Sequence, residues 1–212
     1  MSAKTLKWII CVFIIAGNFL GMLDSSTVNL ALFPIAKDLN VTLAQVQWVI
    51  IAYMLVLTVF LPFFGKLGDM FPKNKIYSAG FLIFALGAFL NFTADSFYAL
   101  ITFRCIEALG ASIMVANGPA AIAALFKGEE RGKALGLNAC LVAVGGMSGP
   151  ALGGFLINAF DWHAIFLPSV PIALIGAYYS YKLLPKIATK KVFKFDYKGF
   201  IYFTIGLFAL LL

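Results

Sequence analysis

Long apolar segments alternate with short polar ones along nearly the whole chain. The six longest apolar segments cover residues 8–31, 47–67, 76–93, 97–125, 134–158 and 164–184. A helix needs about 20 apolar residues to cross a hydrocarbon core of about 30 Å, so each segment predicts a membrane-spanning helix. A seventh apolar segment begins near Gly199 and stops at Leu212, which is too short to span.

Only short polar segments separate the predicted spans, and none leaves room for a soluble domain. We expect loops at Pro34–Gln45, Gly65–Lys75, Thr93–Ser96, Lys127–Lys133 and Asp161–His163. Six spans joined in this way divide into two groups of three, the arrangement of inverted repeats in secondary transporters. The sequence therefore predicts an all-α integral membrane fold: a six-helix bundle of two inverted three-helix repeats, followed by the start of a seventh helix.

The same pattern divides the chain into three segments. We expect residues 1–184 to form the six-helix bundle, residues 185–198 a basic linker, and residues 199–212 the truncated start of a seventh transmembrane helix. Because the last apolar segment is cut off in mid-helix, the chain is expected to be the first half of a longer protein or a fragment of one. A natural half-length protein is the alternative.

Composition and charge place the chain in a membrane. Of its residues 62% are hydrophobic and 12% charged, whereas soluble domains carry about 25% charged residues. The net charge of +7 does not point to nucleic acid, because all but two of the 16 basic residues flank the first span or the connections after the second, fourth and sixth spans. The exceptions are Lys37 and Arg104. By the positive-inside rule, the N-terminus and the end of the bundle are both cytoplasmic.

The sequence offers no residue pattern that is typical of a metal site, a cofactor site or an enzyme active site. The cysteines Cys11, Cys105 and Cys140 lie inside apolar segments and are expected to be small core residues without a disulfide framework. His163 is the single histidine and is expected at the surface. With no clustered metal ligands, no phosphate-binding glycine loop and no nucleophile–base set, we expect no metal, no cofactor and no enzyme.

Three ionisable residues lie inside predicted spans, where a charge usually faces a wet cavity or a partner. Arg104 and Glu107 share one face of the fourth span and can pair with each other. Asp24 lies in a hydrophilic stretch of the first span that continues to Asn29. A carboxyl group between an apolar environment and the Arg104 cation can bind and release protons. Asp24, Arg104 and Glu107 are therefore candidates for proton coupling; a self-neutralised ion pair and a structural hydrogen-bonding role are the alternatives.

Glycine and proline recur in the fifth span in a pattern that a soluble helix rarely carries, because each destabilises a helix relative to alanine. Gly145, Gly149 and Gly153 form one smooth stripe, and Gly146, Pro150 and Gly154 form a second beside it. Such stripes let a neighbouring membrane helix approach closely, and neighbours can satisfy the carbonyl that the proline frees. We expect this helix to pack tightly and to bend.

The segment between the second and third spans contains Gly65, Asp69, Lys73 and Lys75. Its single carboxylate stands in an otherwise basic loop. Asp69 is expected either to cap the next helix or to pair with a basic residue of a neighbouring loop. A pair of the second kind that breaks between two conformations would act as a cytoplasmic gate.

Nearly the whole chain resembles the major facilitator superfamily and, within it, the N-terminal half of the fourteen-helix drug:proton antiporters. The fifth-span residues Gly145, Gly149, Pro150, Gly153 and Gly154 match the antiporter motif of that branch at every defined position. The stretch from Leu23 to Leu32 is similar to its first-helix motif, with Phe33 in place of the usual Pro. Trp48 with Ala52 and Tyr53, and Trp162 with Phe166, Leu167 and Pro171, are similar to the starts of its second and sixth helices.

The chain departs from this pattern at four positions in two motifs. Met70 replaces a basic residue and Pro72 a glycine in the loop motif, while Glu107 replaces a glutamine and Ala108 a glycine in the fourth-helix motif. The additional carboxyl group of Glu107 would alter proton coupling, favour cationic substrates or occupy Arg104.

The resemblance implies a proton-coupled exporter of amphipathic drugs or related small molecules in a membrane, by analogy the bacterial cytoplasmic membrane. Asp24, Asn29 and Glu107 would line its substrate cavity. The implied partners are a small-molecule substrate, protons, the lipid bilayer, and the C-terminal half of the same chain or a second copy. The alternatives are an uptake or metabolite carrier of the same fold, and a non-transporting half-length membrane protein that acts with a partner.

Overall fold

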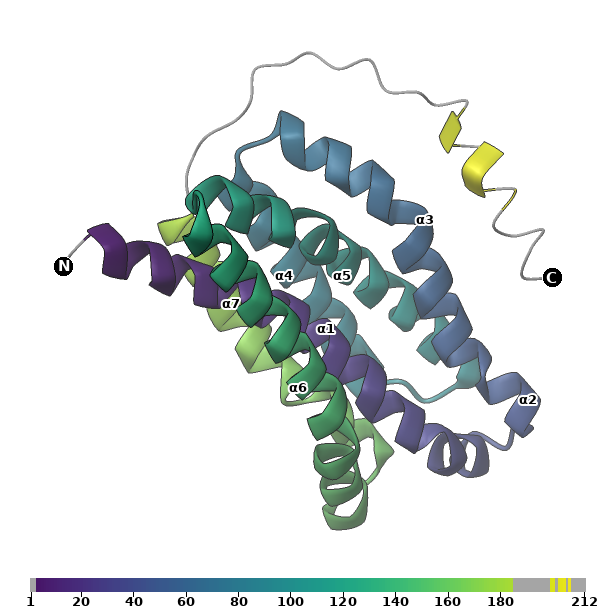
Figure 1. The fold of residues 1–212 in the computed structure, drawn as a ribbon. Helices are drawn as coiled ribbons and strands as arrows, with labels where there is room; N and C mark the ends of the chain where they lie inside the picture. Colours follow the sequence, from purple (N-terminus) through teal and green to yellow (C-terminus); the bar gives the residue numbers. More distant parts are fainter. Residues whose placement is uncertain (1–2, 185–198, 201, 205, 207–212) are drawn as a thin grey trace.

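Six long helices, each apolar and long enough to cross a membrane, make up the bundle in Figure 1. The structure is a computed structural model that describes residues 3–184, 199–200, 202–204 and 206. In chain order the elements are α1 (Ala3–Asp38), α2 (Leu43–Val46), α3 (Trp48–Met70), α4 (Lys73–Phe92), α5 (Phe97–Leu125), α6 (Glu129–Ala159), the 3-10 helix η1 (Trp162–Phe166) and α7 (Ser169–Leu183). These described residues contain no strand. The prediction of an all-α, six-helix membrane bundle is confirmed.

Three of the five predicted loops are wrong at their boundaries, because the helices continue past the apolar segments. Helix α1 runs through Pro34 to Asp38, α3 contains Gly65 and Asp69, and α6 begins at Glu129. Hydropathy marks the residues that suit hydrocarbon, whereas backbone hydrogen bonds can carry a helix on into the polar interface. Pro34 remains helical because its neighbours can compensate the lost hydrogen bond.

Local side-chain signals end and start the helices at the remaining short connections. Thr42 and Gln45 form a reciprocal capping box at α2, and the Ser96 side chain accepts a hydrogen bond from the Ala99 amide at α5. Asp161 caps η1 by accepting from the His163 amide at 2.8 Å. Gly128 precedes α6 with φ of 57°, a conformation that glycine adopts without strain.

The helices pair in a way that relates the first three spans to the last three. Helix α1 packs along α6, and α5 packs along α3, while α4 packs against both α5 and α7. Exchanging the two halves of the bundle converts the α1–α6 contact into the α5–α3 contact. This pairing agrees with two inverted three-helix repeats.

Basic residues gather at one end of the bundle. Figure 1 shows the start of α1, the α3–α4 and α5–α6 connections and the end of α7 toward the upper left of the view. The described basic residues at this end are Lys7, Lys66, Lys73, Lys75, Lys127, Arg131, Lys133 and Lys182. Lys37 lies at the opposite end of α1. The five basic residues of the predicted linker lie outside the described residues: Lys186, Lys190, Lys191, Lys194 and Lys198.

Glycines bring two helix pairs to backbone distance. On α6, a Cβ added at Gly145 would lie 2.9 Å from the Phe19 carbonyl oxygen of α1. A Cβ added at Gly153 would lie 2.7 Å from Thr27 Cγ2 of the same helix. On α4, a Cβ at Gly87 would lie 2.5 Å from the Glu107 Cα of α5. Close approach of this kind supplies the van der Waals contact that holds membrane helices together.

Helices α3 and α6 leave most of their apolar residues unburied by the rest of the bundle. Only 22% and 17% of the residues in their most apolar stretches are buried, against 44% or more in the other four spans. The expectation of three core cysteines is wrong for the same reason: Cys11 is buried and Cys105 half-buried, but Cys140 lies on the bare surface of α6.

Gly87→Ala should destabilise the bundle by about 1–3 kcal/mol, because its methyl group meets the backbone of α5 rather than a movable side chain. Thermal unfolding of the purified full-length protein measures the effect. Gly136→Ala is the matched control, since nothing lies within 4 Å of a Cβ there. Equal stability of the two variants would contradict the close α4–α5 contact.

Candidate functional site

The three ionisable residues of the spans meet in one buried cluster. Arg104 Nη1 lies 2.5 Å from Asp24 Oδ2 and 2.7 Å from Glu107 Oε2. The side chains of Arg104, Asp24 and Glu107 are each exposed by 1% or less. The structure therefore forms both pairs that the sequence suggested separately, and one guanidinium nitrogen serves two carboxylates. We call these three residues the ion cluster.

Residues from three further elements hold the ion cluster in place. Asn91 of α4 donates a hydrogen bond from Nδ2 to Glu107 Oε2 at 2.6 Å. The Tyr53 ring of α3 lies over the guanidinium, with 4.1 Å from its centroid to Arg104 Cζ. The Phe166 ring of η1 lies on the same group at 5.8 Å. Aromatic rings attract cations through their negative faces, so both contacts favour the charged guanidinium.

Charge counting indicates what the ion cluster can do chemically. Two carboxylates and one guanidinium carry a net charge of −1 when all are ionised, and an uncompensated buried charge is costly. One proton shared by the two carboxyl groups makes the cluster neutral. Asp24 Oδ1 and Glu107 Oε1 are buried and have no hydrogen-bond partner among the described residues, so each has room to carry that proton.

Polar side chains in the hydrophilic stretch of α1 form hydrogen bonds to the backbone of their own helix. Thr27 Oγ1 donates to the Leu23 carbonyl oxygen, and Asn29 Nδ2 donates to the Ser25 carbonyl oxygen at 3.1 Å. Bonds of this type satisfy polar groups inside an apolar helix without a partner helix. Asn29 is exposed.

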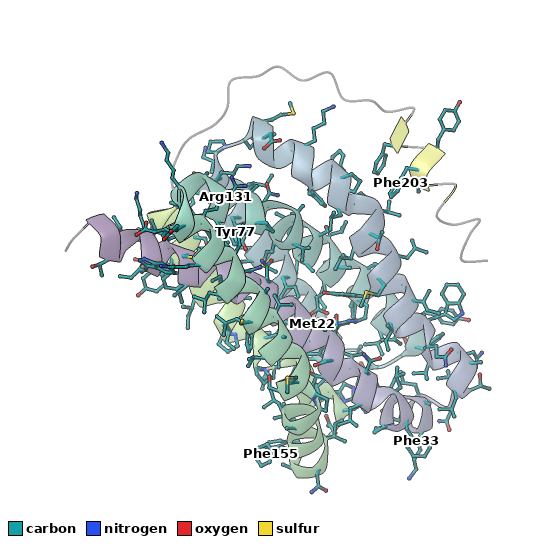
Figure 2. The ribbon with its side chains drawn as sticks, viewed as in Figure 1. Met22, Phe33, Tyr77, Arg131, Phe155 and Phe203 are labelled. Carbon is teal, nitrogen blue, oxygen red and sulfur yellow. The ribbon has the colours of Figure 1, made fainter. Side chains whose placement is uncertain are left out.

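A cavity of about 310 Å³ lies between α1, α3, α5 and α6. Its wall is formed by Asn18, Gly21, Met22, Ser25, Tyr53, Met54, Leu57, Val115, Pro119, Asn138 and Val142. Met22, labelled in Figure 2, marks its position on α1. The three residues expected to line a substrate cavity, Asp24, Asn29 and Glu107, are not part of this wall.

Tyr53 explains why the carboxyl groups are absent from the cavity wall. Its side chain contributes to the wall and at the same time covers Arg104, so it stands between the cavity and the ion cluster. The sequence did not identify two further polar residues of the wall, Asn18 and Asn138. Asn18 Nδ2 donates a hydrogen bond to Asn138 Oδ1 at 2.8 Å, which links α1 to α6. The sequence signal that could have identified them is an amide side chain within an otherwise apolar span.

The residues expected to form a cytoplasmic gate lie in helices rather than in a loop. Asp69 Oδ1 pairs with Lys73 Nζ at 3.2 Å across the α3–α4 turn, and Asp69 is exposed. The helix-cap alternative is wrong, because Pro72 occupies the N-cap of α4 and no side chain caps it. A Cβ added at Gly65 would lie 3.9 Å from Ala116 Cβ of α5, and Lys75 is exposed.

The single histidine packs at the other end of the bundle. His163 stacks on Trp162 with 3.6 Å between ring centroids, and its Nε2 lies 3.2 Å from the Ala94 carbonyl oxygen. Trp162 Nε1 donates to Asp38 Oδ2 at 2.9 Å. These contacts tie the ends of α1, α4 and η1 together. Within the described part of the chain, no three His, Cys, Asp or Glu side chains are placed to hold a metal ion.

Residues 14–210 match the family model described as Major Facilitator Superfamily. The chain is 40% identical over 198 residues to the riboflavin transporter RibZ of Clostridioides difficile, covering 93% of this chain and 43% of that protein. It is 31% identical over 212 residues to a candidate multidrug resistance protein, MdtD, of Pectobacterium carotovorum, covering 100% of this chain and 45% of that protein. The chain thus spans less than half the length of these relatives.

Solved structures share the fold at low sequence identity. The proton:xylose symporter XylE aligns with a TM-score of 0.78 at 13% identity, over 87% of this chain and 46% of that one. A bacterial homologue of the lysosomal transporter Spinster, inward-facing and unoccupied, aligns with a TM-score of 0.74 at 17% identity, over 92% of this chain and 47% of that one.

Arg104→Gln should destabilise the protein by about 3–5 kcal/mol, because it leaves two buried carboxyl groups without their cation. Adding Glu107→Gln to this variant should recover part of the loss. Thermal unfolding of the purified full-length protein measures both effects, with Arg131→Gln at the exposed start of α6 as the control (Figure 2). A double variant no more stable than Arg104→Gln alone would contradict the charge balance.

Proposed function

Because this chain belongs to the Major Facilitator Superfamily, a family of transporters and not of enzymes, we propose that it forms the N-terminal half of a proton-coupled antiporter. In this proposal the complete protein exports amphipathic drugs or related small molecules. The observation that carries it is the buried ion cluster of Asp24, Arg104 and Glu107.

The ion cluster has two states whose relative free energy depends on contact with water. Buried behind Tyr53, it is most stable when one proton makes it neutral. Opened to water on one side of the membrane, its carboxyl groups gain hydration and can release that proton. A conformational change that alternates between these environments couples proton movement to transport.

The bare faces of α3 and α6 support a second bundle as the missing partner. Its source in this proposal is the C-terminal half of the same chain or a second copy. Residues 1–184 then form one bundle, 185–198 a cytoplasmic linker, and 199–212 the first of the extra helices of the fourteen-helix branch. Of the last two segments, only residues 199–200, 202–204 and 206 are described.

The charge distribution supports an orientation for this multi-pass membrane protein. The end of the bundle that gathers the described lysines and arginines faces the cytoplasm under the positive-inside rule. The bacterial relatives favour the bacterial cytoplasmic membrane.

In this proposal two further segments serve the conformational change. The first is the region around the α3–α4 turn, where the cytoplasmic gate would consist of Gly65, Asp69, Lys73 and Lys75. The observed Asp69–Lys73 pair joins the two helices within this turn. Gly145, Gly149 and Gly153 set α6 directly against α1, the helix that carries Asp24. Pro150 and Gly154 lie beside this contact, so bending of α6 would be transmitted to Asp24.

A metabolite carrier is the second candidate, and one finding favours it. The relative named as a riboflavin transporter is 40% identical to this chain, whereas the one named for multidrug resistance is 31% identical. The first name supports a specific metabolite and the second supports drug export. A non-transporting half-length membrane protein that acts with a partner is the third candidate.

Asp24→Asn should abolish proton-coupled transport while the protein still inserts into the membrane, because the amide cannot bind and release the coupled proton. Inverted membrane vesicles containing the full-length protein are loaded with protons, and lumenal pH is followed by a dye as substrates are added. Asp95→Asn, on the exposed α4–α5 turn, is the matched control. Unchanged proton release in Asp24→Asn would exclude this residue from coupling.

Vesicle orientation separates export from uptake. If the protein exports its substrate, inverted vesicles with an acidic lumen should accumulate it, and collapsing the proton gradient should stop the accumulation. Accumulation in right-side-out vesicles with the physiological gradient would identify an uptake carrier instead. The measurement is substrate retained by the vesicles after filtration.

A further inference from the structure

We propose that the 310 Å³ cavity between α1, α3, α5 and α6 binds an uncharged, planar aromatic molecule that carries a hydrogen-bonding edge. The proposal rests on the proposed transport function and names the substrate class of that site. It departs from the expectation that Asp24 and Glu107 give the site a preference for cations.

The cavity wall contains no carboxylate and no basic group among the described residues. Asp24 and Glu107 are exposed by 1% or less and are both engaged with Arg104. Tyr53 belongs to the cavity wall, and its ring covers the guanidinium that both carboxylates contact. A cation against this wall would meet no countercharge from the described residues, so an uncharged molecule of the same shape is favoured.

The apolar part of the wall suits a flat ring system. Met22 and Met54 contribute polarisable, adaptable side chains, and Leu57 and Val142 contribute aliphatic ones. Tyr53 is the aromatic residue of the wall. The volume lies at the lower end of the range for small-molecule sites, which is about 300–1,000 Å³, and a second bundle would close the open side.

Polar atoms are concentrated at a few points of the same wall. Asn138 Oδ1 already accepts a hydrogen bond from Asn18, so the Nδ2 donor is what Asn138 can offer to a ligand carbonyl. Tyr53 is 1% exposed, and its hydroxyl group has no hydrogen-bond partner among the described residues. A few placed polar groups in a largely apolar site fix the orientation of a ligand and select for it.

Acridone and proflavine form a suitable probe pair. Acridone is uncharged and carries one carbonyl and one N–H group, whereas proflavine is a cation on the same three-ring skeleton. Binding of each to the purified full-length protein is measured by fluorescence titration. We expect acridone to bind at least about tenfold more tightly than proflavine.

Gly21→Leu tests the location of the site. A Cβ at Gly21 meets only the Tyr53 hydroxyl, at 3.8 Å, so a larger side chain can enter the cavity without a backbone clash. This variant should weaken acridone binding by about tenfold or more. Gly132→Leu is the matched control, because nothing lies within 4 Å of a Cβ there and it is outside the wall. Acridone binding that is equally strong in both variants would overturn the proposal.

Asn138→Leu tests the hydrogen-bonding edge and should weaken acridone binding by about three- to tenfold. Asn158→Leu, an exposed amide on the same helix, should have no effect. If proflavine binds as tightly as acridone and Gly21→Leu weakens its binding, the proposal that the ligand is uncharged is overturned. These outcomes are distinct from failure of the proposed function: proton-coupled transport of cations without acridone binding removes only this inference, whereas acridone binding without any proton-coupled transport removes only the antiport mechanism.

Discussion

The buried guanidinium of Arg104 is the constraint on which the rest of the bundle depends. A cation at this depth is tolerated only with its countercharges in place, and Asp24 and Glu107 both lie within 2.7 Å of the same nitrogen. Asn91, Tyr53 and Phe166 complete its surroundings from three other elements. Helices α1, α3, α4 and α5 must therefore stand in one register at this level, which makes the ion cluster a structural centre of the bundle.

Small residues allow that register to form. Gly87 and Gly110 let α4 and α5 touch through their backbones beside Glu107, so Asn91 comes within hydrogen-bond distance of it. Gly145 and Gly153 do the same for α6 and α1, the helix of Asp24. Because lipid tails compete equally for apolar side chains, close packing of this kind supplies much of the association energy of membrane helices. The packing of α6 against α1 and the position of Asp24 are consequently linked.

Tyr53 connects the ion cluster to the cavity that lies in front of it. One residue covers the guanidinium and forms part of the cavity wall, so a molecule that displaces the Tyr53 ring also changes the surroundings of Arg104. The cavity and the ion cluster are therefore neighbours that share Tyr53. Helices α3 and α6, which line this cavity, are also the two least buried spans of the bundle.

The sequence by itself determined the features that depend on local composition. Six apolar segments predicted six helices, the basic residues predicted which connections share a side, and isolated charges marked Asp24, Arg104 and Glu107. Helix ends were misplaced near Pro34, Gly65 and Glu129, because hydropathy measures compatibility with lipid and not the extent of backbone hydrogen bonding. Only the tertiary structure decided that Asp24 meets a guanidinium 80 residues away, and that Tyr53 rather than a carboxylate faces the cavity. Both outcomes follow from the packing of helices distant in the chain, which no local pattern of residues encodes.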